Sequence, residues 1–91
     1  MAEIMFTIIV SEQALSELKI LPLRIQLHIE QKINHILKVN PRPHGKNPKR
    51  LKGENLFRLR IGDYRVVYRI DPAHCSVIIV AIKHRKDVYE D

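Results

Sequence analysis

The segment LFRLRIGDYRVVYRI, Leu56 to Ile70, concentrates positive charge on a single predicted hairpin. It contains four arginines, namely Arg58, Arg60, Arg65 and Arg69. A guanidinium group binds phosphate through two parallel hydrogen bonds, whereas the ammonium of lysine acts as a point charge. Because like charges crowded together repel each other, such a cluster needs an anionic ligand or partner to compensate it. The segment therefore predicts a site for phosphate groups.

Strand geometry predicts the face of the hairpin on which these arginines lie. Gly62-Asp63 is a strong signal for a two-residue turn, which sets Ile61 opposite Tyr64 and Arg60 opposite Arg65. Side chains alternate between the faces of a strand. One face then collects the apolar residues Phe57, Leu59, Ile61, Tyr64, Val66, Tyr68 and Ile70. The other face collects Leu56, Arg58, Arg60, Arg65, Val67 and Arg69. Because like charges directly opposite each other destabilise a strand pair, we interpret the second face as a binding surface rather than a merely solvated one.

Further cations flank the hairpin. Lys49, Arg50 and Lys52 precede it, and Lys83 ends the last apolar run of the chain. Arg85 lies on the same side as Lys83 if that strand continues. The residues that we predict to bind RNA or DNA outside the central cluster are Lys49, Arg50, Lys52 and Arg69. Charge of this kind gives affinity for a phosphate backbone but no sequence specificity.

The overall composition agrees with a polyanionic partner. Sixteen Lys and Arg residues against ten Asp and Glu residues give the 91-residue chain a formal net charge of +6. This length predicts one domain, residues 1–91. A compact basic domain suggests nucleic acid, an anionic membrane or an acidic protein as partner, although charge can also serve only solubility. The apolar run MFTIIV is too short to span a membrane, so we expect a soluble cytoplasmic protein with no membrane partner.

No metal site and no disulfide are predicted. Cys75 is the only cysteine, which excludes an internal disulfide. The histidines outside the C-terminal segment have no metal-ligand spacing; they are His28, His35, His44 and His74. We therefore expect neither a metal nor a cofactor.

The first forty residues predict a strand followed by two helices. Glu3–Val10 is apolar and β-branched, as strands are. Ser11 suits the N-cap of a first helix, and Pro22 suits the first turn of a second helix that reaches about Val39. Apolar residues recur at helical spacing at Ala14, Leu15, Leu18 and Leu21, and then at Ile25, Ile29, Ile33, Ile36 and Leu37.

The remaining residues predict strands. Asn40–Gly53 is a loop rich in proline, with a short edge strand near Arg50–Lys52. Leu56–Ile61 and Tyr64–Ile70 form the hairpin, and the apolar run Val77–Lys83 predicts a central strand buried on both faces. The order is β-α-α-β-β-β. It predicts an α+β domain, with an antiparallel sheet and a helical hairpin packed on one face.

Three segments resemble the signature of the RelE/ParE superfamily of bacterial and archaeal toxins. They are RLKG, LFRLRIGDYRVVYRI and VIIVAIKHRKDVY, and with the N-terminal strand and helical hairpin the resemblance covers essentially the whole chain. The motif GDYRVVY, followed by an apolar strand and HRKDVY, is similar to the RelE branch. The resemblance implies a RelE-like fold and a toxin that enters the A site of the 70S ribosome, contacts rRNA and cuts mRNA there. It also implies a cognate antitoxin that blocks the basic face.

In this family the cut proceeds without metal. The ribose 2′-hydroxyl attacks the adjacent phosphate, which leaves a 2′,3′-cyclic phosphate and a 5′-hydroxyl. This reaction needs a base for the 2′-hydroxyl proton, cations for the phosphorane and an acid for the leaving 5′-oxygen. The resemblance assigns phosphate stabilisation to Arg65 and phosphate binding to Arg58 and Arg60. Lys83 stands where RelE itself carries an arginine that serves as a candidate acid, and Arg85 is the alternative.

Two residues compete for the role of base. Tyr89 matches the C-terminal tyrosine of the family, which stacks on a nucleobase or acts as general base. Its ordinary pKa is near 10, so surrounding cations would have to lower it. The imidazole of His84 is a better base near pH 7. We favour Tyr89, because a straight strand would point His84 away from Lys83 and Arg85.

Two other functions are compatible with the sequence. A DNA gyrase inhibitor of the ParE branch would not need Arg65 or Tyr89. A catalytically inactive relative would only bind nucleic acid, so that single arginine changes would weaken binding without any loss of cleavage.

Overall fold

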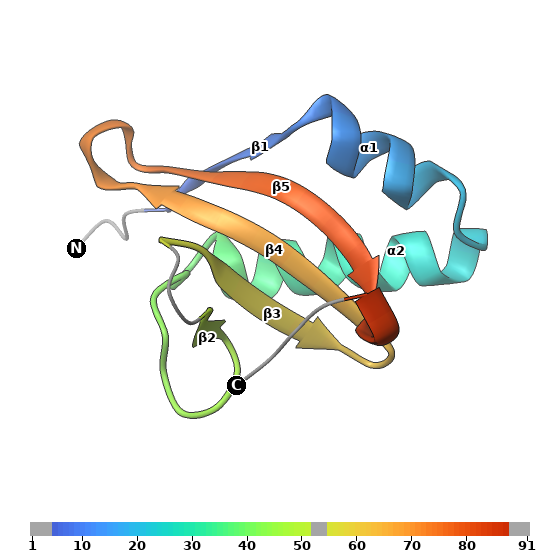
Figure 1. The fold of residues 1–91 in the computed structure, drawn as a ribbon. Helices are drawn as coiled ribbons and strands as arrows, with labels where there is room; N and C mark the ends of the chain where they lie inside the picture. The colour runs from blue at the N-terminus through green and yellow to red at the C-terminus, as the bar shows by residue number, and fades with distance from the viewer. Residues whose placement is uncertain (1–4, 52–54, 88–91) are drawn as a thin grey trace.

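One five-stranded sheet forms the centre of the part of the chain that the structure describes, residues 5–51 and 55–87 of a computed structural model (Figure 1). Its strands are β1 (Thr7–Val10), β2 (Lys49–Arg50), β3 (Phe57–Ile61), β4 (Tyr64–Asp71) and β5 (Ser76–His84). Their spatial order is β1-β5-β4-β3-β2. Two helices precede the last four of these strands, so the predicted α+β class and element order are confirmed.

The first strand departs from the predicted antiparallel arrangement. β1 runs parallel to β5, with Thr7 beside Ser76 and Val10 beside Ile79, whereas the other described strand pairs are antiparallel. Strands that run parallel are joined by a long crossover, here through the helices and the hairpin, and the side-chain pattern of a short strand does not encode its direction. β5 is therefore an internal strand between β1 and β4, as predicted, but the middle strand is β4. The prediction that β5 is buried on both faces is met only in part, because Ile78, Val80 and Ala81 are partly exposed.

The helices begin where the sequence places their caps. α1 (Glu12–Lys19) follows Ser11, whose hydroxyl accepts a hydrogen bond from the Ala14 amide at 3.1 Å. α2 (Leu23–Lys32) begins directly after Pro22 and continues as a π-helical turn, Ile33–Leu37. No helix among the described residues is long and apolar enough to cross a membrane.

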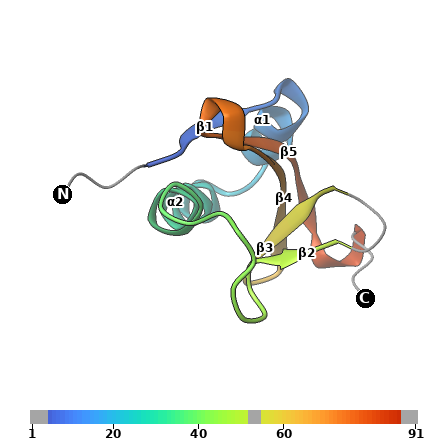
Figure 2. The same cartoon turned by 90° about the vertical axis from the view of Figure 1, so that its left-hand side faces the viewer.

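The two helices meet the sheet in different ways. α2 lies over one side of β3, β4 and β5, as the nearly edge-on view in Figure 2 shows. α1 lies along the part of β5 that extends beyond β1 (Figure 1). The Ser11 amide donates to the Ile79 carbonyl at 3.0 Å, and the Ile82 amide donates to the Glu17 carboxylate at 2.9 Å. Polar groups at this open edge of β5 are thus bonded by α1.

The core confirms the predicted apolar faces. Phe6 just before β1, both helices, the π-helical turn and the strands β3, β4 and β5 contribute to it: Phe6, Ala14, Leu18, Ile29, Ile33, Leu37, Leu59, Ile61, Val66, Tyr68, Val77, Ile79 and Ile82. The hairpin register is also the predicted one, with Ile61 opposite Tyr64 and Arg60 opposite Arg65. Gly62 has a φ of 57°, a left-handed conformation that glycine adopts without strain.

Candidate nucleic-acid interface

The face of β3 and β4 that is turned away from α2 carries Arg58, Arg60, Arg65 and Arg69, and we call it the arginine face. Its four arginines are not equally accessible. Arg60 and Arg69 are exposed, whereas Arg58 and Arg65 are only 3% and 7% exposed. Two of the four arginines that the sequence places on this face are therefore buried. Protein acceptors hold the two buried guanidinium groups in fixed orientations, whereas the two exposed arginines are surrounded by solvent.

Arg58 is held by the loop that precedes β2. Its Nη1 donates to the Lys46 carbonyl and to the Asn47 side-chain oxygen, both at 3.3 Å. Lys49 pairs with Arg58 across β2 and β3, so both side chains lie on the same face. Arg50, the other residue of β2, is exposed at the same edge of the sheet. The predicted edge strand thus exists and brings Lys49 to the arginine face, whereas Arg50 pairs with Phe57 and lies on the other face of the sheet.

Arg65 is turned towards the hairpin turn. Its Nη1 donates to the carbonyl oxygens of Gly62 and Tyr64, both at 3.0 Å. These carbonyl dipoles offset part of the repulsion from Arg60, which lies directly opposite on β3. An anion bound at this pair would meet one guanidinium of fixed orientation and one that is free to move in solvent.

Lys83 lies directly opposite Arg65 on β5, but its ammonium is engaged elsewhere. It forms an ion pair with Glu17 of α1. The hydrogen bond and the charge of Glu17 raise the pKa of Lys83. Burial raises the pKa of Glu17, but the bonds from Lys83 and the Ile82 amide, together with the charge of Lys83, outweigh burial and leave that pKa below its ordinary value. Lys83 is therefore a charged group that already has a counterion.

β5 ends at His84, so Arg85 does not continue the line of Lys83. The chain turns there into a 3-10 helix, Arg85–Asp87. The Arg85 amide donates to the Asp63 carbonyl at 2.7 Å, and its side chain lies 3.6 Å from the Asp63 carboxylate. The strand therefore does not continue to Arg85, which was the condition under which Arg85 would share the side of Lys83.

His84 lies on the opposite face of β5 from Lys83, as expected, because consecutive side chains of a strand alternate between its faces. It pairs with Tyr64 across β4 and β5, and the two rings meet edge to face with centroids 5.5 Å apart. This places the imidazole on the α2 side of the sheet rather than on the arginine face.

The described tyrosines provide no base on the arginine face. Tyr68 is buried in the core, and its hydroxyl donates to the Pro41 carbonyl at 2.6 Å. Burial raises the pKa of Tyr68, and the charge of Arg58 reverses only part of that rise. A phenol in this state does not accept a proton near pH 7. Tyr89 and Lys52, two of the residues singled out in the sequence, lie outside the described residues.

A hollow of about 300 Å³ adjoins Arg69, at the end of the arginine face away from the hairpin turn. Its described lining is Asn55, Leu56, Arg69 and Val80. The hollow coincides with a bulge in β5, because Val67 pairs with Ala81 and Tyr68 with Ile79, which leaves Val80 without a partner in the ladder. Bulges re-aim side chains and open space beside a strand. Arg69 thus stands beside a partly apolar hollow.

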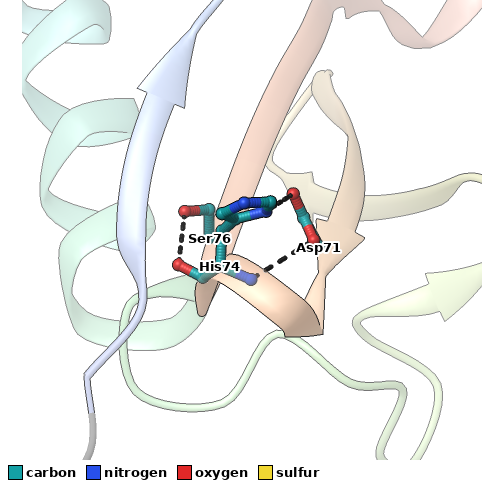
Figure 3. A network of polar contacts seen from close by, with 3 residues as sticks. All are labelled: Asp71, His74 and Ser76. Carbon is teal, nitrogen blue, oxygen red and sulfur yellow. Dashed lines mark hydrogen bonds and ion pairs between the residues drawn. The ribbon is translucent and has the colours of Figure 1, made fainter.

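Asp71, His74 and Ser76 lie together at the turn between β4 and β5 but do not form a nucleophilic triad (Figure 3). Nδ1 of His74 lies 2.8 Å from the Asp71 carboxylate, and this hydrogen bond lowers the pKa of Asp71. The Ser76 hydroxyl donates to the backbone carbonyl of His74 at 2.9 Å instead of to the imidazole ring. The three residues therefore cap a turn. In addition, no three side chains of the kinds that bind metal gather within residues 5–51 and 55–87.

Two residues with clear roles at this site were not predicted. Asn47 supports Arg58, and its side chain also bonds the backbone of Arg60. Glu17 pairs with Lys83. Both contacts join residues that are distant in the sequence, and neither residue belongs to a motif, so no local signal could have found them.

Comparison with known proteins identifies the class. Residues 8–89 match the sequence profile of the family described as ParE toxin of type II toxin-antitoxin system, parDE. Toxin RelG of Mycobacterium tuberculosis is 43% identical over 42 residues, a match that spans 46% of this chain and 48% of RelG, about half of each.

Solved structures agree with this match. The toxin-antitoxin complex RelBE2 from Mycobacterium tuberculosis gives a TM-score of 0.78 at 31% identity, covering 94% of this chain and 98% of that one. The archaeal RelE-RelB complex from Pyrococcus horikoshii gives 0.74 at 26% identity, covering 91% and 98%. The α+β fold of this chain is the one that these two solved chains share. The chain belongs to the RelE/ParE superfamily, as a toxin of the RelE family.

Proposed function

We propose that this toxin is a ribosome-dependent mRNA endonuclease, which cleaves message in the ribosomal A site by metal-independent attack of the 2′-hydroxyl and so inhibits translation. The observation that carries the proposal is the pairing of Arg60 with Arg65 on the arginine face. Two cations directly opposite each other are unfavourable in a sheet unless an anion compensates them. A phosphodiester is an anion of the right geometry for guanidinium groups.

The arrangement suits a reaction whose charge develops on phosphorus oxygens. Arg65 is buried and oriented by two carbonyl oxygens, so it needs little reorganisation when the phosphorane forms. In our proposal Arg65 stabilises the phosphorane, and Arg58 and Arg60 hold the scissile phosphate. The 2′-oxygen bonds to phosphorus, the bond to the 5′-oxygen breaks, and the products are a 2′,3′-cyclic phosphate and a 5′-hydroxyl.

Two protons must move in this reaction. We propose Tyr89 as the residue that stacks on a nucleobase or accepts the 2′-hydroxyl proton. The position of His84 on the α2 side of the sheet favours Tyr89 over His84. The proton for the leaving 5′-oxygen is assigned by the family pattern to Lys83 or Arg85. In this structure Lys83 is paired with Glu17, and Arg85 lies against Asp63.

Message and rRNA would bind through the cations around the central cluster, Lys49, Arg50, Lys52 and Arg69. The hollow beside Arg69 offers room for one nucleobase next to a cation. These groups hold a backbone without reading its sequence, so positioning by the ribosome would supply the alignment that the toxin lacks by itself.

We also propose a cognate antitoxin and a cytoplasmic site of action. The RelBE2 structure and the archaeal RelE-RelB structure are both complexes of a toxin with its antitoxin. An antitoxin that covered the arginine face would compensate its charge in place of RNA and block access to it.

Primer extension on a defined message bound to purified 70S ribosomes tests the proposal. We expect new 5′ ends within the A-site codon for the wild-type toxin, and their loss for Arg65→Ala. Tyr89→Phe tests the base. Arg24→Ala is the matched control, because Arg24 is an exposed arginine on α2, on the other side of the sheet. A folded wild-type toxin that produced no cuts would overturn the proposal.

The match to the ParE profile favours a second candidate, inhibition of DNA gyrase. That activity involves no RNA chemistry, so it would survive both Arg65→Ala and Tyr89→Phe. A supercoiling assay with purified gyrase distinguishes the two. If neither assay responds, the third possibility applies, a relative that binds nucleic acid without cleaving it.

A further inference from the structure

Lys83 and Arg65 are cross-strand neighbours on β5 and β4. Residues directly opposite each other in an antiparallel pair have Cβ atoms about 4.5–5.5 Å apart and point to the same face. The ammonium of Lys83 stands on a flexible four-carbon stem. From its backbone position it could therefore reach an anion bound at Arg65.

Glu17 holds that ammonium at the edge of the sheet instead. Oε2 of Glu17 pairs with Nζ of Lys83, and Oε1 accepts the Ile82 amide hydrogen at 2.9 Å. Both carboxylate oxygens are thus bonded to consecutive residues of β5. The carboxylate is 19% exposed and the lysine 36%, so water reaches the pair only in part.

The helix that carries Glu17 is firmly placed. Its neighbours in the helix, Ala14 and Leu18, are buried in the core at 0% and 6% exposure. At the start of the helix, the Ser11 hydroxyl donates to the Val80 carbonyl at 3.3 Å. These contacts fix the backbone position of Glu17, and the hydrogen bond from the Ile82 amide orients its carboxylate beside Lys83.

We propose that Glu17 is a positioning residue that withholds Lys83 from the phosphate bound at Arg65, and so sets the number of cations that the toxin offers to RNA. This inference rests on the proposed binding of RNA to the arginine face. It implies that Lys83 contributes little to RNA binding in the wild-type toxin, and that the loss of one carboxylate charge would recruit it.

Glu17→Gln is the decisive variant, because the amide oxygen of glutamine still accepts the Ile82 hydrogen bond while the counterion of Lys83 is lost. The measurement is the affinity for a short single-stranded RNA with 2′-O-methyl riboses, which cannot be cleaved, at several salt concentrations. We expect tighter binding, on the order of fivefold, and a plot of log K against log salt that is steeper by about 0.7, the increment for one added phosphate contact.

Glu12→Gln is the matched control. It removes one negative charge from the same helix, but Glu12 is exposed in the first turn of α1. A general effect of net charge would appear equally in both variants. A salt dependence that changes no more in Glu17→Gln than in Glu12→Gln overturns the inference.

Lys83→Met completes a double-mutant cycle. In the wild-type background it should change the slope of log K against log salt by much less than about 0.7, the increment for one phosphate contact. In the Glu17→Gln background it should cancel the gain in RNA affinity and the steeper slope. A gain that persists without Lys83 overturns the inference. So does a wild-type slope that falls by about 0.7 on Lys83→Met alone, a result that does not depend on the folding of Glu17→Gln.

These measurements are separate from the test of cleavage. Loss of message cutting with a retained Glu17 effect would leave the inference standing and remove the nuclease. Message cutting that depends on Arg65, together with RNA binding that Glu17→Gln leaves unchanged, would support the nuclease and overturn the inference. A toxin whose affinity for RNA is unchanged by Arg65→Ala would overturn the inference as well.

Discussion

The side chain of Asn47 bonds the backbone of Arg60 as a neighbouring strand would. The Arg60 amide donates to Oδ1 of Asn47 at 2.7 Å, and Nδ2 of Asn47 donates to the Arg60 carbonyl at 2.9 Å. The ladder of β2 with β3 pairs Lys49 with Arg58, two residues before Arg60. Asn47 therefore extends the pairing of β3 with a side chain, and the same Oδ1 also accepts from Arg58.

We expect Asn47→Ala to destabilise the fold by about 1 kcal/mol and to weaken RNA binding. The free-energy loss corresponds to the net value of hydrogen bonds at an accessible site. The weaker binding follows because Arg58 loses one acceptor and the loop no longer holds Lys46 in place. Urea unfolding gives the first quantity and RNA affinity at constant salt the second.

Asn34→Ala is the control for this prediction, because Asn34 is an exposed amide on the π-helical turn after α2. It should leave both quantities unchanged or raise stability slightly, since alanine favours a helix. Equal effects of the two variants would show that Asn47 has no special role.

Tyr68→Phe should lower stability without loss of message cutting. The variant removes the hydrogen bond from the buried hydroxyl to the Pro41 carbonyl, so we expect the free energy of unfolding to fall by about 1–2 kcal/mol. Cutting should persist because the pKa of Tyr68 is raised by burial and its side chain lies in the core. Urea unfolding and primer extension measure the two effects.

Tyr64→Phe serves as its comparison, since Tyr64 is only partly buried and contacts His84 through its ring. A smaller stability loss than that of Tyr68→Phe is expected. Abolished cutting in folded Tyr68→Phe would show that this phenol takes part in the reaction.

The sequence predicted the hairpin in residue-level detail for a physical reason. Strand side chains alternate with a period of two, so once Gly62 fixed a two-residue turn, both faces and the pairing of Arg60 with Arg65 followed. Residue type predicted the N-cap at Ser11 and the start of the second helix at Pro22, which the structure places directly before the first turn of α2. Local chemistry decides these features.

The burial of Arg58 and Arg65 could not be predicted in this way. Burial of an arginine depends on acceptors that other segments supply, such as the Lys46 carbonyl for Arg58. The pairing of Lys83 with Glu17 and the parallel direction of β1 have the same origin. Each depends on contacts between residues that are distant along the chain, which no local pattern encodes.

The Glu17–Lys83 pair predicts how stability depends on pH. The pKa of Glu17 is lowered from 4.5, so its contribution is present above pH 4.5 and is lost as pH falls through the folded-state pKa. The pKa of Lys83 is raised from 10.5, so its contribution is present below pH 10.5 and is lost as pH rises through the higher folded-state value. The stability difference between wild type and Glu17→Gln should therefore be largest between these two limits.

Urea unfolding of both proteins at about pH 7 and about pH 3 measures this difference, which should shrink at the lower pH as Glu17 becomes protonated. Glu12→Gln is again the comparison, and its difference from wild type should change less. If the stability difference between wild type and Glu17→Gln were the same at both pH values, the ion pair of Glu17 with Lys83 would not stabilise the fold.

His84→Phe tests which residue accepts the 2′-hydroxyl proton. Phenylalanine keeps an aromatic ring against Tyr64 but cannot accept a proton, so it preserves the packing and removes the base. Because His84 lies on the α2 side of the sheet, we expect message cutting to fall by less than about threefold, while Tyr89→Phe lowers it by about 100-fold or more, the range of general base catalysis. Single-turnover cutting on 70S ribosomes across pH measures both. If His84→Phe abolished cutting in a folded toxin and Tyr89→Phe did not, the imidazole would be the base, and β5 would have to turn near His84 when the message binds.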